Sequence, residues 1–186
     1  GCNSYPAAKP ETVEAYVGAL HREIDLVARH IDNSRQISQI HYGGGSPTSI
    51  PIPMLKELND HLLSIAPTIA SPEIAIECHP GYLSEHDWQQ LTACGFTRYS
   101  IGIQDMKEEV LKAVNRRPSL LPLQEILQIL RASGATVNFD FIYGLPLQSV
   151  DSFRKTIEQA SALRPDRLVT FSYAHLPKLF PRQQIL

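Results

Sequence analysis

Apolar residues along this 186-residue chain follow two patterns that take turns along the sequence. In the first, apolar residues recur every three or four positions, as on the buried face of a helix. In the second, they alternate with polar residues or form a short continuous run, as in a strand. Helices are predicted over 11–31, 53–65, 84–95, 110–114, 122–134 and 149–163. Strands are predicted over 37–42, 73–78, 98–103, 137–143 and 167–173. The two kinds of element therefore alternate along the chain.

Local signals mark several of the helix ends. Ser84 and Asp87 have the spacing of a capping box, and Ser149 can cap a later helix. Gly95 and Gly134 are placed to end helices in the left-handed conformation. Five strands alternating with amphipathic helices predict an α/β fold with a parallel sheet, curved into a barrel. No domain boundary or low-complexity segment interrupts it, so residues 1–186 are expected to form one domain.

The composition is that of an ordinary globular protein, with 43% hydrophobic and 19% charged residues. A net charge of −2 gives no general reason to expect nucleic acid or an anionic membrane as a partner. No apolar run approaches the roughly 20 residues of a membrane span, and no signal peptide is recognisable. The three cysteines, Cys2, Cys78 and Cys94, lack Cys-x-x-Cys spacing, which favours a reducing compartment. The cytoplasm is the expected location.

A glycine-rich turn follows the first predicted strand, with the sequence Gly43-Gly44-Gly45-Ser46-Pro47-Thr48. Glycines allow backbone conformations closed to other residues and leave the main-chain N–H groups uncovered. A glycine turn at the carboxyl end of a strand is where α/β proteins place ligands. The alternative is a tight strand-to-helix connection. The turn is longer than such a connection needs, which favours contact with a ligand.

Polar residues also stand at or near the ends of the later strands. Glu77, Gln104, Asp140 and His175 each occupy such a position. In a barrel of parallel strands these ends meet at one mouth, where side chains can reach a ligand. Each residue also has a simpler interpretation: a helix cap or solvated loop for the acidic residues and Gln104, and a surface position for His175. Arg116 near a helix end would suit the helix dipole without any ligand.

The glycine turn, the polar strand ends and several further segments together resemble the radical S-adenosylmethionine (SAM) superfamily, and within it the oxygen-independent coproporphyrinogen III oxidases. They occur in the order and spacing of that family and cover nearly the whole chain. The matching segments are Gly1-Cys2-Asn3, Tyr42-Gly43-Gly44-Gly45-Ser46-Pro47-Thr48, Ile76-Glu77, Ser100-Ile101-Gly102-Ile103-Gln104-Asp105, Val114-Asn115-Arg116, Asp140-Phe141-Ile142-Tyr143-Gly144-Leu145-Pro146 and Tyr173-Ala174-His175-Leu176-Pro177.

The resemblance implies a partial (β/α)6 barrel of the radical SAM type whose mouth holds a [4Fe–4S] cluster and two SAM molecules. Gly44 and Glu77 would contact the first SAM. The second would be held by a larger set: Gly45, Ser46, Gln104, Arg116, Asp140 and Ala174. Ser46 departs mildly from the threonine that is usual in the family. The implied reaction is the oxidative decarboxylation of two propionate groups of coproporphyrinogen III to give protoporphyrinogen IX, with electrons from a donor that the sequence does not identify.

The sequence departs from the family in its cluster ligands. The superfamily binds its cluster through Cys-x-x-x-Cys-x-x-Cys on the first strand, and no such motif occurs in this chain. Cys2 resembles the extra cysteine that follows those ligands in the family. We therefore expect this chain to be a fragment that lacks the first strand and a carboxyl-terminal region, and to be inactive alone. Cys78 is expected to be a buried apolar residue and Cys94 a helix residue.

Two other functions remain open. A non-catalytic haem-binding chaperone, paralogous to the oxidase, shares the glycine motif and Gly144-Leu145-Pro146. Arg116, Gln104 and the segment 173–177 favour the oxidase, because they suit a second SAM site. A phosphate-binding barrel enzyme could use the glycine turn as an anion nest, although the joint match of the other segments argues against it.

Overall fold

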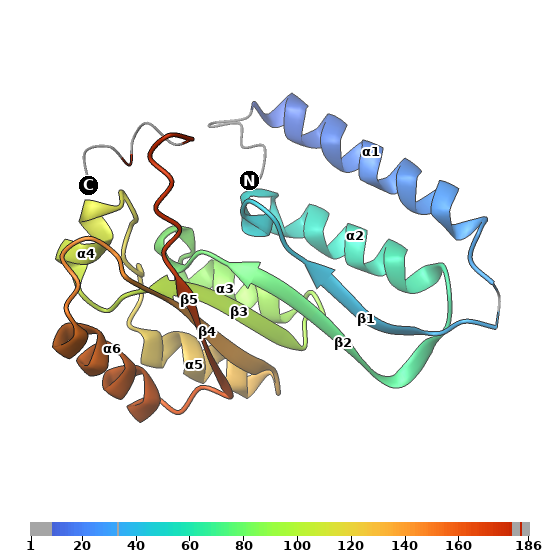
Figure 1. The fold of residues 1–186 in the computed structure, drawn as a ribbon. Helices are drawn as coiled ribbons and strands as arrows, with labels where there is room; N and C mark the ends of the chain where they lie inside the picture. Colours follow the sequence, from blue (N-terminus) through green and yellow to red (C-terminus); the bar gives the residue numbers. More distant parts are fainter. Residues whose placement is uncertain (1–8, 33, 180–182, 184–186) are drawn as a thin grey trace.

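A computed structural model describes residues 9–32, 34–179 and 183, and it contains one five-stranded parallel sheet (Figure 1). The strands are β1 (Ile37–Tyr42), β2 (Thr68–Cys78), β3 (Arg98–Gln104), β4 (Thr136–Tyr143) and β5 (Arg167–Ser172). Their order in the sheet is their order in the sequence. Each predicted strand is therefore present, and the parallel α/β arrangement is confirmed.

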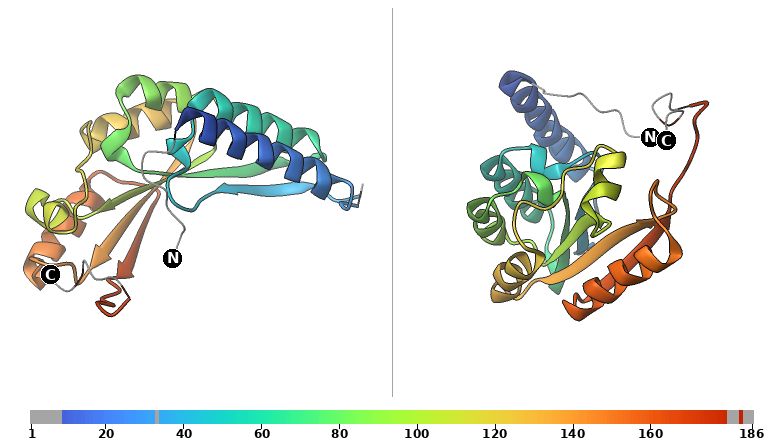
Figure 2. Two further views of the ribbon diagram at one scale, coloured as in Figure 1. Left: turned by 90° about the horizontal axis from the view of Figure 1, so that it is seen from above. Right: turned by 90° about the vertical axis from the view of Figure 1, so that its left-hand side faces the viewer.

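Six α-helices connect or flank the strands. They are α1 (Pro10–Ala28), α2 (Ile52–Ser64), α3 (Glu85–Thr92), α4 (Glu108–Ala113), α5 (Leu123–Ala132) and α6 (Val150–Ala162), with short 3₁₀ turns η1 (Pro47–Ser49) and η2 (Pro80–Tyr82). Figure 2 shows that the sheet curls like part of a barrel wall, with α2, α3, α5 and α6 along its convex face. Helix α1 packs beside α2, and the short α4 lies near the carboxyl ends of the strands. The concave face of the sheet is left without a covering helix in the part of the chain described.

The hydrophobic core lies between the convex face of the sheet and the helices. On β3, Tyr99 and Ile101 are fully buried against this layer, while Ser100, Gly102 and Gln104 alternate toward the concave face. The largest fully buried side chains of the core are Trp88, Tyr99, Phe139, Phe141, Leu55, Ile76 and Leu91. Burying each of the larger apolar side chains contributes roughly 1.5–3 kcal/mol. The period-2 alternation thus separates a core face from a polar face.

Helix boundaries agree with the capping signals. Ser84 and Asp87 form the expected capping box at the start of α3, and the Ser149 side chain accepts a hydrogen bond from the Ser152 N–H at the start of α6. Gly95 and Gly134 have positive φ angles of 84° and 80° just after α3 and α5. A side chain at either position would be strained, which explains why each helix ends there.

Two local expectations are wrong. Strand β2 begins at Thr68, five residues before the predicted start at position 73, and its pairing with β1 is irregular between Ile37 and Gln39. The additional residues of β2 include Pro72, which lacks an N–H donor and is unusual inside a strand. Cys94 lies in the turn after α3 and not in the helix, and its thiol packs near the Gln90 carbonyl. It is nevertheless buried.

None of the helices in the described part of the chain is both long enough and apolar enough to cross a membrane.

Candidate ligand site at the carboxyl ends of the strands

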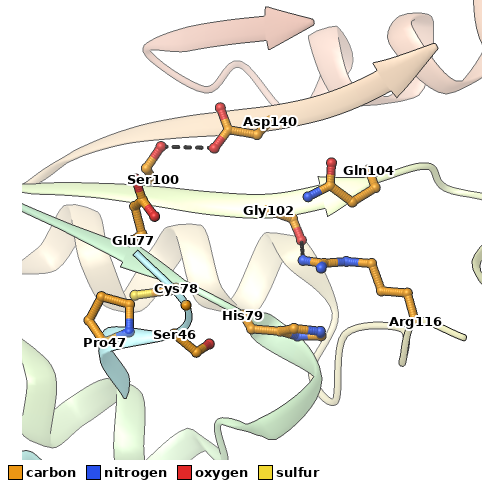
Figure 3. A pocket seen from close by; sticks show the side chains of 11 residues that line it. Ser46, Pro47, Glu77, Cys78, His79, Ser100, Gly102, Gln104, Arg116 and Asp140 are labelled. Atoms are coloured by element: carbon orange, nitrogen blue, oxygen red, sulfur yellow. Dashed lines mark hydrogen bonds between the residues drawn. The ribbon is translucent and has the colours of Figure 1, made fainter. Parts of the chain in front are cut away.

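A groove of about 160 Å³ lies at the carboxyl ends of the strands (Figure 3). It contains most of the candidate residues, namely Gly45, Ser46, Glu77, Gln104, Arg116 and Asp140. Its other lining residues are Pro47, Cys78, His79, Ser100 and Gly102. The candidates Gly44 and Ala174 are not among the residues that line it. The polar residues that follow different strands are therefore brought together, as the barrel interpretation predicts.

The glycine turn forms one wall of the groove. Gly44 has a φ angle of 112°, which side-chain-bearing residues rarely adopt, so this residue shapes the turn. A Cβ atom at Gly45 would meet nothing within 4 Å, so its main chain is open to an approaching ligand. A Cβ atom at Gly43 would lie 2.8 Å from Nε2 of His41 and 3.0 Å from Oε1 of Glu77. The first glycine thus leaves room for those two side chains.

Glu77 projects from the end of β2 onto the concave face. Its Oε1 lies 3.2 Å from Nε2 of His41 on the neighbouring strand, and both side chains are close to half exposed. The carboxylate is therefore positioned by its neighbour without being sealed from the groove. It remains available to a cationic group of a ligand.

Asp140 is fixed by a cross-strand network. Its Oδ2 accepts a hydrogen bond of 3.0 Å from the Ser100 hydroxyl, and its Oδ1 accepts one of 2.8 Å from Asn138. Asn138 also donates to the Ser100 hydroxyl at 2.6 Å. The buried Oδ1 of Asn138 has no hydrogen-bond partner in the described part of the molecule. A second acidic group is thereby held rigidly beside Glu77.

The end of β3 is irregular where it lines the groove. The pairing of β3 with β4 shifts between Gly102 and Gln104, and Gln104 has a positive φ angle of 71°. Its side-chain oxygen is buried and unpartnered within the described residues. Bulges and unusual backbone angles of this kind are frequent beside functional sites. Here they turn the Gln104 side chain over Gly102.

Arg116 reaches the groove from the loop that follows α4. Its Nη2 donates to the Gly102 carbonyl oxygen, and its guanidinium group forms no ion pair with any residue of the described ranges. Burial lowers the pKa of Arg116, while Tyr82 and Asp140 act in the opposite direction. Arginine stays protonated in proteins, so a partly buried cation with spare donors faces the groove. Such a group suits a carboxylate, which it can bind with two parallel hydrogen bonds.

His79 lies between η2 and the groove. Its Nδ1 accepts a hydrogen bond of 3.1 Å from the Gly81 N–H. Burial and then the positive charge of Arg116, with a smaller effect of Arg117, lower the pKa of His79 to about 4. The imidazole is therefore neutral near pH 7. The sequence placed this residue at a strand end but assigned it no role.

A second hollow of about 270 Å³ adjoins the groove and shares His79, Gln104 and Arg116 with it. Its remaining lining is more apolar and comprises Val114, Asn115, Ile142, Leu145 and Tyr173. The exposed Ala174 follows Tyr173, so this candidate lies beside the second hollow without lining either space. The ring of His175 is tilted against that of Tyr173, 6.2 Å away, and His175 lines neither space.

Several lining residues were missed in the sequence, although the alternation of the strands carried a signal. Ser100 and Gly102 alternate with buried residues on β3 and so lie on the same face as Gln104. Asn138 lies on the same face of β4 as Asp140 and supports it without lining the groove. Counting back by two from each polar strand end would have found them. Asp105 behaves differently from its neighbour: it is buried behind the sheet and does not line the groove.

The cysteines of the described region do not form a metal site. Cys78 and Cys94 are both buried, and burial raises the pKa of each thiol. Within residues 9–32, 34–179 and 183, no group of three or more His, Cys, Asp or Glu residues could hold a metal ion. The expectation for Cys2 lies outside the described residues. These residues thus offer donors and acceptors for an organic ligand but no ligand set for an iron–sulfur cluster.

Comparison with known proteins gives consistent matches. A family model described as the radical SAM superfamily matches residues 8–160. The oxygen-independent coproporphyrinogen III oxidase of Synechocystis is 36% identical over 185 residues, covering 99% of this chain and 40% of that protein. The Pseudomonas aeruginosa enzyme of the same name is 39% identical over 175 residues, covering 91% of this chain and 37% of that protein.

Solved structures extend the comparison to the fold. The coproporphyrinogen III oxidase of Escherichia coli, described as a radical SAM enzyme, superposes with a TM-score of 0.89 and 36% identity, over 99% of this chain and 42% of that one. A radical SAM methyltransferase from Kitasatospora setae gives a TM-score of 0.63 at 14% identity, over 88% of this chain and 29% of that one, which supports the fold alone. The chain spans about 40% of the length of the curated relatives that it matches.

Proposed function

Because the chain belongs to the radical SAM superfamily, we propose that it forms the SAM-binding core of an oxygen-independent coproporphyrinogen III oxidase. The observation that carries the proposal is the groove. It gathers Gly45, Ser46, Glu77, Gln104, Arg116 and Asp140, which come from five separate segments. The similarity to the oxidases covers almost the whole chain and includes every one of these segments.

The charges of the groove match those of a SAM molecule. The methionyl end of SAM carries an ammonium and a carboxylate, and its sulfonium carries a further positive charge. Glu77 on β2 and Asp140 on β4 provide negative charge on the wall formed by β2, β3 and β4, whereas Arg116 provides positive charge from the loop after α4. A ligand with both charges can therefore be oriented in one direction only.

Two SAM molecules are proposed for this site. Glu77 and the backbone of Gly44 contact the first. Arg116 binds the carboxylate of the second, and Asp140 with Gln104 and Ser46 supplies hydrogen bonds to its polar groups. Gly45 allows close approach of the second molecule, because no side chain stands there. Ala174 contributes from the main chain beside the second hollow.

The proposed reaction is the oxidative decarboxylation of two propionate side chains of coproporphyrinogen III. Each propionate would lose one hydrogen atom to a radical derived from SAM, one electron to a one-electron acceptor, and carbon dioxide, which leaves a vinyl group. A [4Fe–4S] cluster bound outside the residues described here would supply the electron that cleaves SAM. The residues described here have a supporting role. They bind SAM, fix its orientation and keep its carboxylate against Arg116. The cluster ligands are proposed to lie outside this chain, and the electron donor is proposed to be a separate partner.

The test uses a longer protein that contains this chain together with the three-cysteine segment. After anaerobic reconstitution it should convert coproporphyrinogen III to protoporphyrinogen IX, measured by fluorescence after oxidation. Arg116→Lys should weaken SAM binding by roughly 1–3 kcal/mol, because a point charge replaces a two-pronged donor. Arg22→Lys, on the exposed side of α1, is the matched control.

Two results would contradict the proposal. Unchanged turnover of both propionates in Arg116→Lys would remove Arg116 from the site. Tight haem binding without any turnover in the reconstituted protein would favour the non-catalytic chaperone function instead.

A further inference from the structure

We propose that His79 acts with Arg116 as a two-residue clamp for a ligand carboxylate, with Nε2 of His79 donating one of the hydrogen bonds. This inference rests on the proposed function, and it assigns a role to a residue outside the set expected from the family resemblance. Both residues line both the groove and the second hollow. Figure 3 shows the imidazole of His79 and the guanidinium group of Arg116 on the same side of the groove.

The hydrogen bond to Gly81 determines which nitrogen of His79 can serve a ligand. Nδ1 accepts from the Gly81 N–H, so it carries no proton. The proton of the neutral ring is therefore on Nε2. Nε2 has no hydrogen-bond partner within the described residues, and it is not among their sealed polar atoms. It is a donor that points to accessible space.

The two loops that carry the clamp are fastened to each other. A Cβ atom at Gly81 would lie 2.8 Å from both Cβ of Arg117 and the Pro118 carbonyl oxygen, so the chain after Arg116 packs directly on η2. The Leu120 N–H also donates to the Pro80 carbonyl oxygen at 3.1 Å. His79 and Arg116 are thus held in a constant relation before any ligand arrives.

A neutral imidazole is the appropriate second donor at this position. A protonated histidine would repel the guanidinium group, and both burial and Arg116 disfavour that form. The clamp therefore combines one full charge with one uncharged donor. A carboxylate can accept from both because it offers several lone pairs on two oxygens.

The carboxylate could belong to the methionyl end of SAM or to a propionate of the substrate. The groove beside Glu77 and Asp140 suits the first, and the more apolar second hollow suits the edge of a tetrapyrrole. The experiment must therefore separate the two sources. S-adenosylhomocysteine is compared with methylthioadenosine, which lacks the amino-acid carboxylate. Coproporphyrin III is compared with its tetramethyl ester.

Each probe is titrated into this chain while the ¹⁵N resonances of the histidine rings are recorded by nuclear magnetic resonance. His79→Asn keeps an oxygen acceptor for the Gly81 N–H but removes the Nε2 donor. His79→Gln places a donor at a similar reach and should restore binding. His30→Asn, at an exposed histidine after α1, is the control.

We expect the Nε2-protonated tautomer of His79 in the free chain and a shift of its Nε2 resonance with one of the two acids. His79→Asn should weaken the binding of that acid about tenfold, which is the scale of one hydrogen bond to a charged group. The corresponding probe without a free carboxylate should bind equally well to both proteins. The acid that loses affinity identifies the source. Equal binding of both acids by parent and His79→Asn would overturn the clamp while leaving the proposed function standing. A parent chain that binds neither acid would contradict both.

Discussion

Arg116 donates from Nη2 to the carbonyl oxygen of Gly102, and a Cβ atom at position 102 would lie only 2.8 Å from that nitrogen. The same Cβ atom would lie 2.9 Å from Nε2 of Gln104. Gly102→Ala should therefore displace both side chains from the groove. We expect binding of S-adenosylhomocysteine to weaken about tenfold, measured by calorimetry, because one charged hydrogen-bond donor leaves its position.

The free energy of unfolding of Gly102→Ala should change by less than about 1 kcal/mol, since the clashing atoms are the ends of flexible side chains. Gly18→Ala is the control: its Cβ would meet only Arg22, at 3.6 Å, and it should stabilise helix α1 by roughly 0.5–1 kcal/mol. Full ligand affinity in Gly102→Ala would show that the contact of Arg116 with Gly102 does not set the geometry of the site.

Asp105 holds the end of β3 to the segment after β4. Its buried carboxylate accepts hydrogen bonds from the Lys107 N–H, the Thr156 hydroxyl and the Gln148 amide, at 2.7, 3.1 and 2.6 Å. Asp105→Ala leaves these donors unpaired and should lower the free energy of unfolding by roughly 3 kcal/mol. Urea denaturation measures this. Asp151→Asn, which breaks only an exposed ion pair with Arg154, should cost no more than about 0.5 kcal/mol.

The stability of the chain should depend on pH through His79. The pKa of His79 is about 4 in the folded state, below its ordinary value of 6.5. The unfolded chain therefore binds more protons between these values, and the free energy of unfolding should rise as the pH increases from 4 to 6.5. The charged and titratable groups facing His79 are Arg116, Arg117 and Tyr82.

This contribution is measured by urea unfolding of the parent chain and of His79→Asn. The pH values are about 4.5, 5.5, 6.5 and 7.5, which cross the range in which His79 is protonated in the unfolded chain. The substitution should flatten the rise. Asp87 also loses stabilisation on acidification, because its hydrogen bonds with Ser84 lower its pKa, but it does so in both proteins. Parallel pH profiles for parent and variant would show that His79 is not held neutral.

Addition of iron and sulfide under anaerobic conditions should not assemble a [4Fe–4S] cluster on this 186-residue chain. Cys78 and Cys94 are buried with raised pKa values, so neither is ready to bind iron as a thiolate. Electron paramagnetic resonance after reduction tests the expectation. A stoichiometric [4Fe–4S]⁺ signal would mean that Cys2, Cys78 and Cys94 converge.

Much of the fold could be read from local patterns. The capping box at Ser84 and the helix-ending Gly95 are short-range effects, so the residues themselves determine them. The extension of β2 back to Thr68 could not be predicted, because it depends on the pairing of Thr68 with Ile37 of β1, beyond an irregular stretch that contains Pro72. The position of Cys94 in a turn likewise depends on where α3 ends, at Thr92.

The site was predictable in its principal residues and less so in its surroundings. Glu77, Gln104 and Asp140 lie in the carboxyl-terminal halves of β2, β3 and β4 and line one groove, as the parallel topology predicts. The roles of His79 and Gly102 depend on Arg116, which comes from a loop whose path no periodicity reveals. Gly44 does not line the groove; its positive φ angle shapes the turn, and the sequence does not show that angle.

The five strands lie in the sheet in the same order as in the sequence, and this order affects how the chain can fold. Each new strand finds its neighbour in the one synthesised just before it, so no strand has to wait for a distant segment. Each pairing therefore closes a single loop of the chain, from one strand to the next in the sequence. The ligand groove is complete only once β4 has paired with β3, because Asp140 comes from β4.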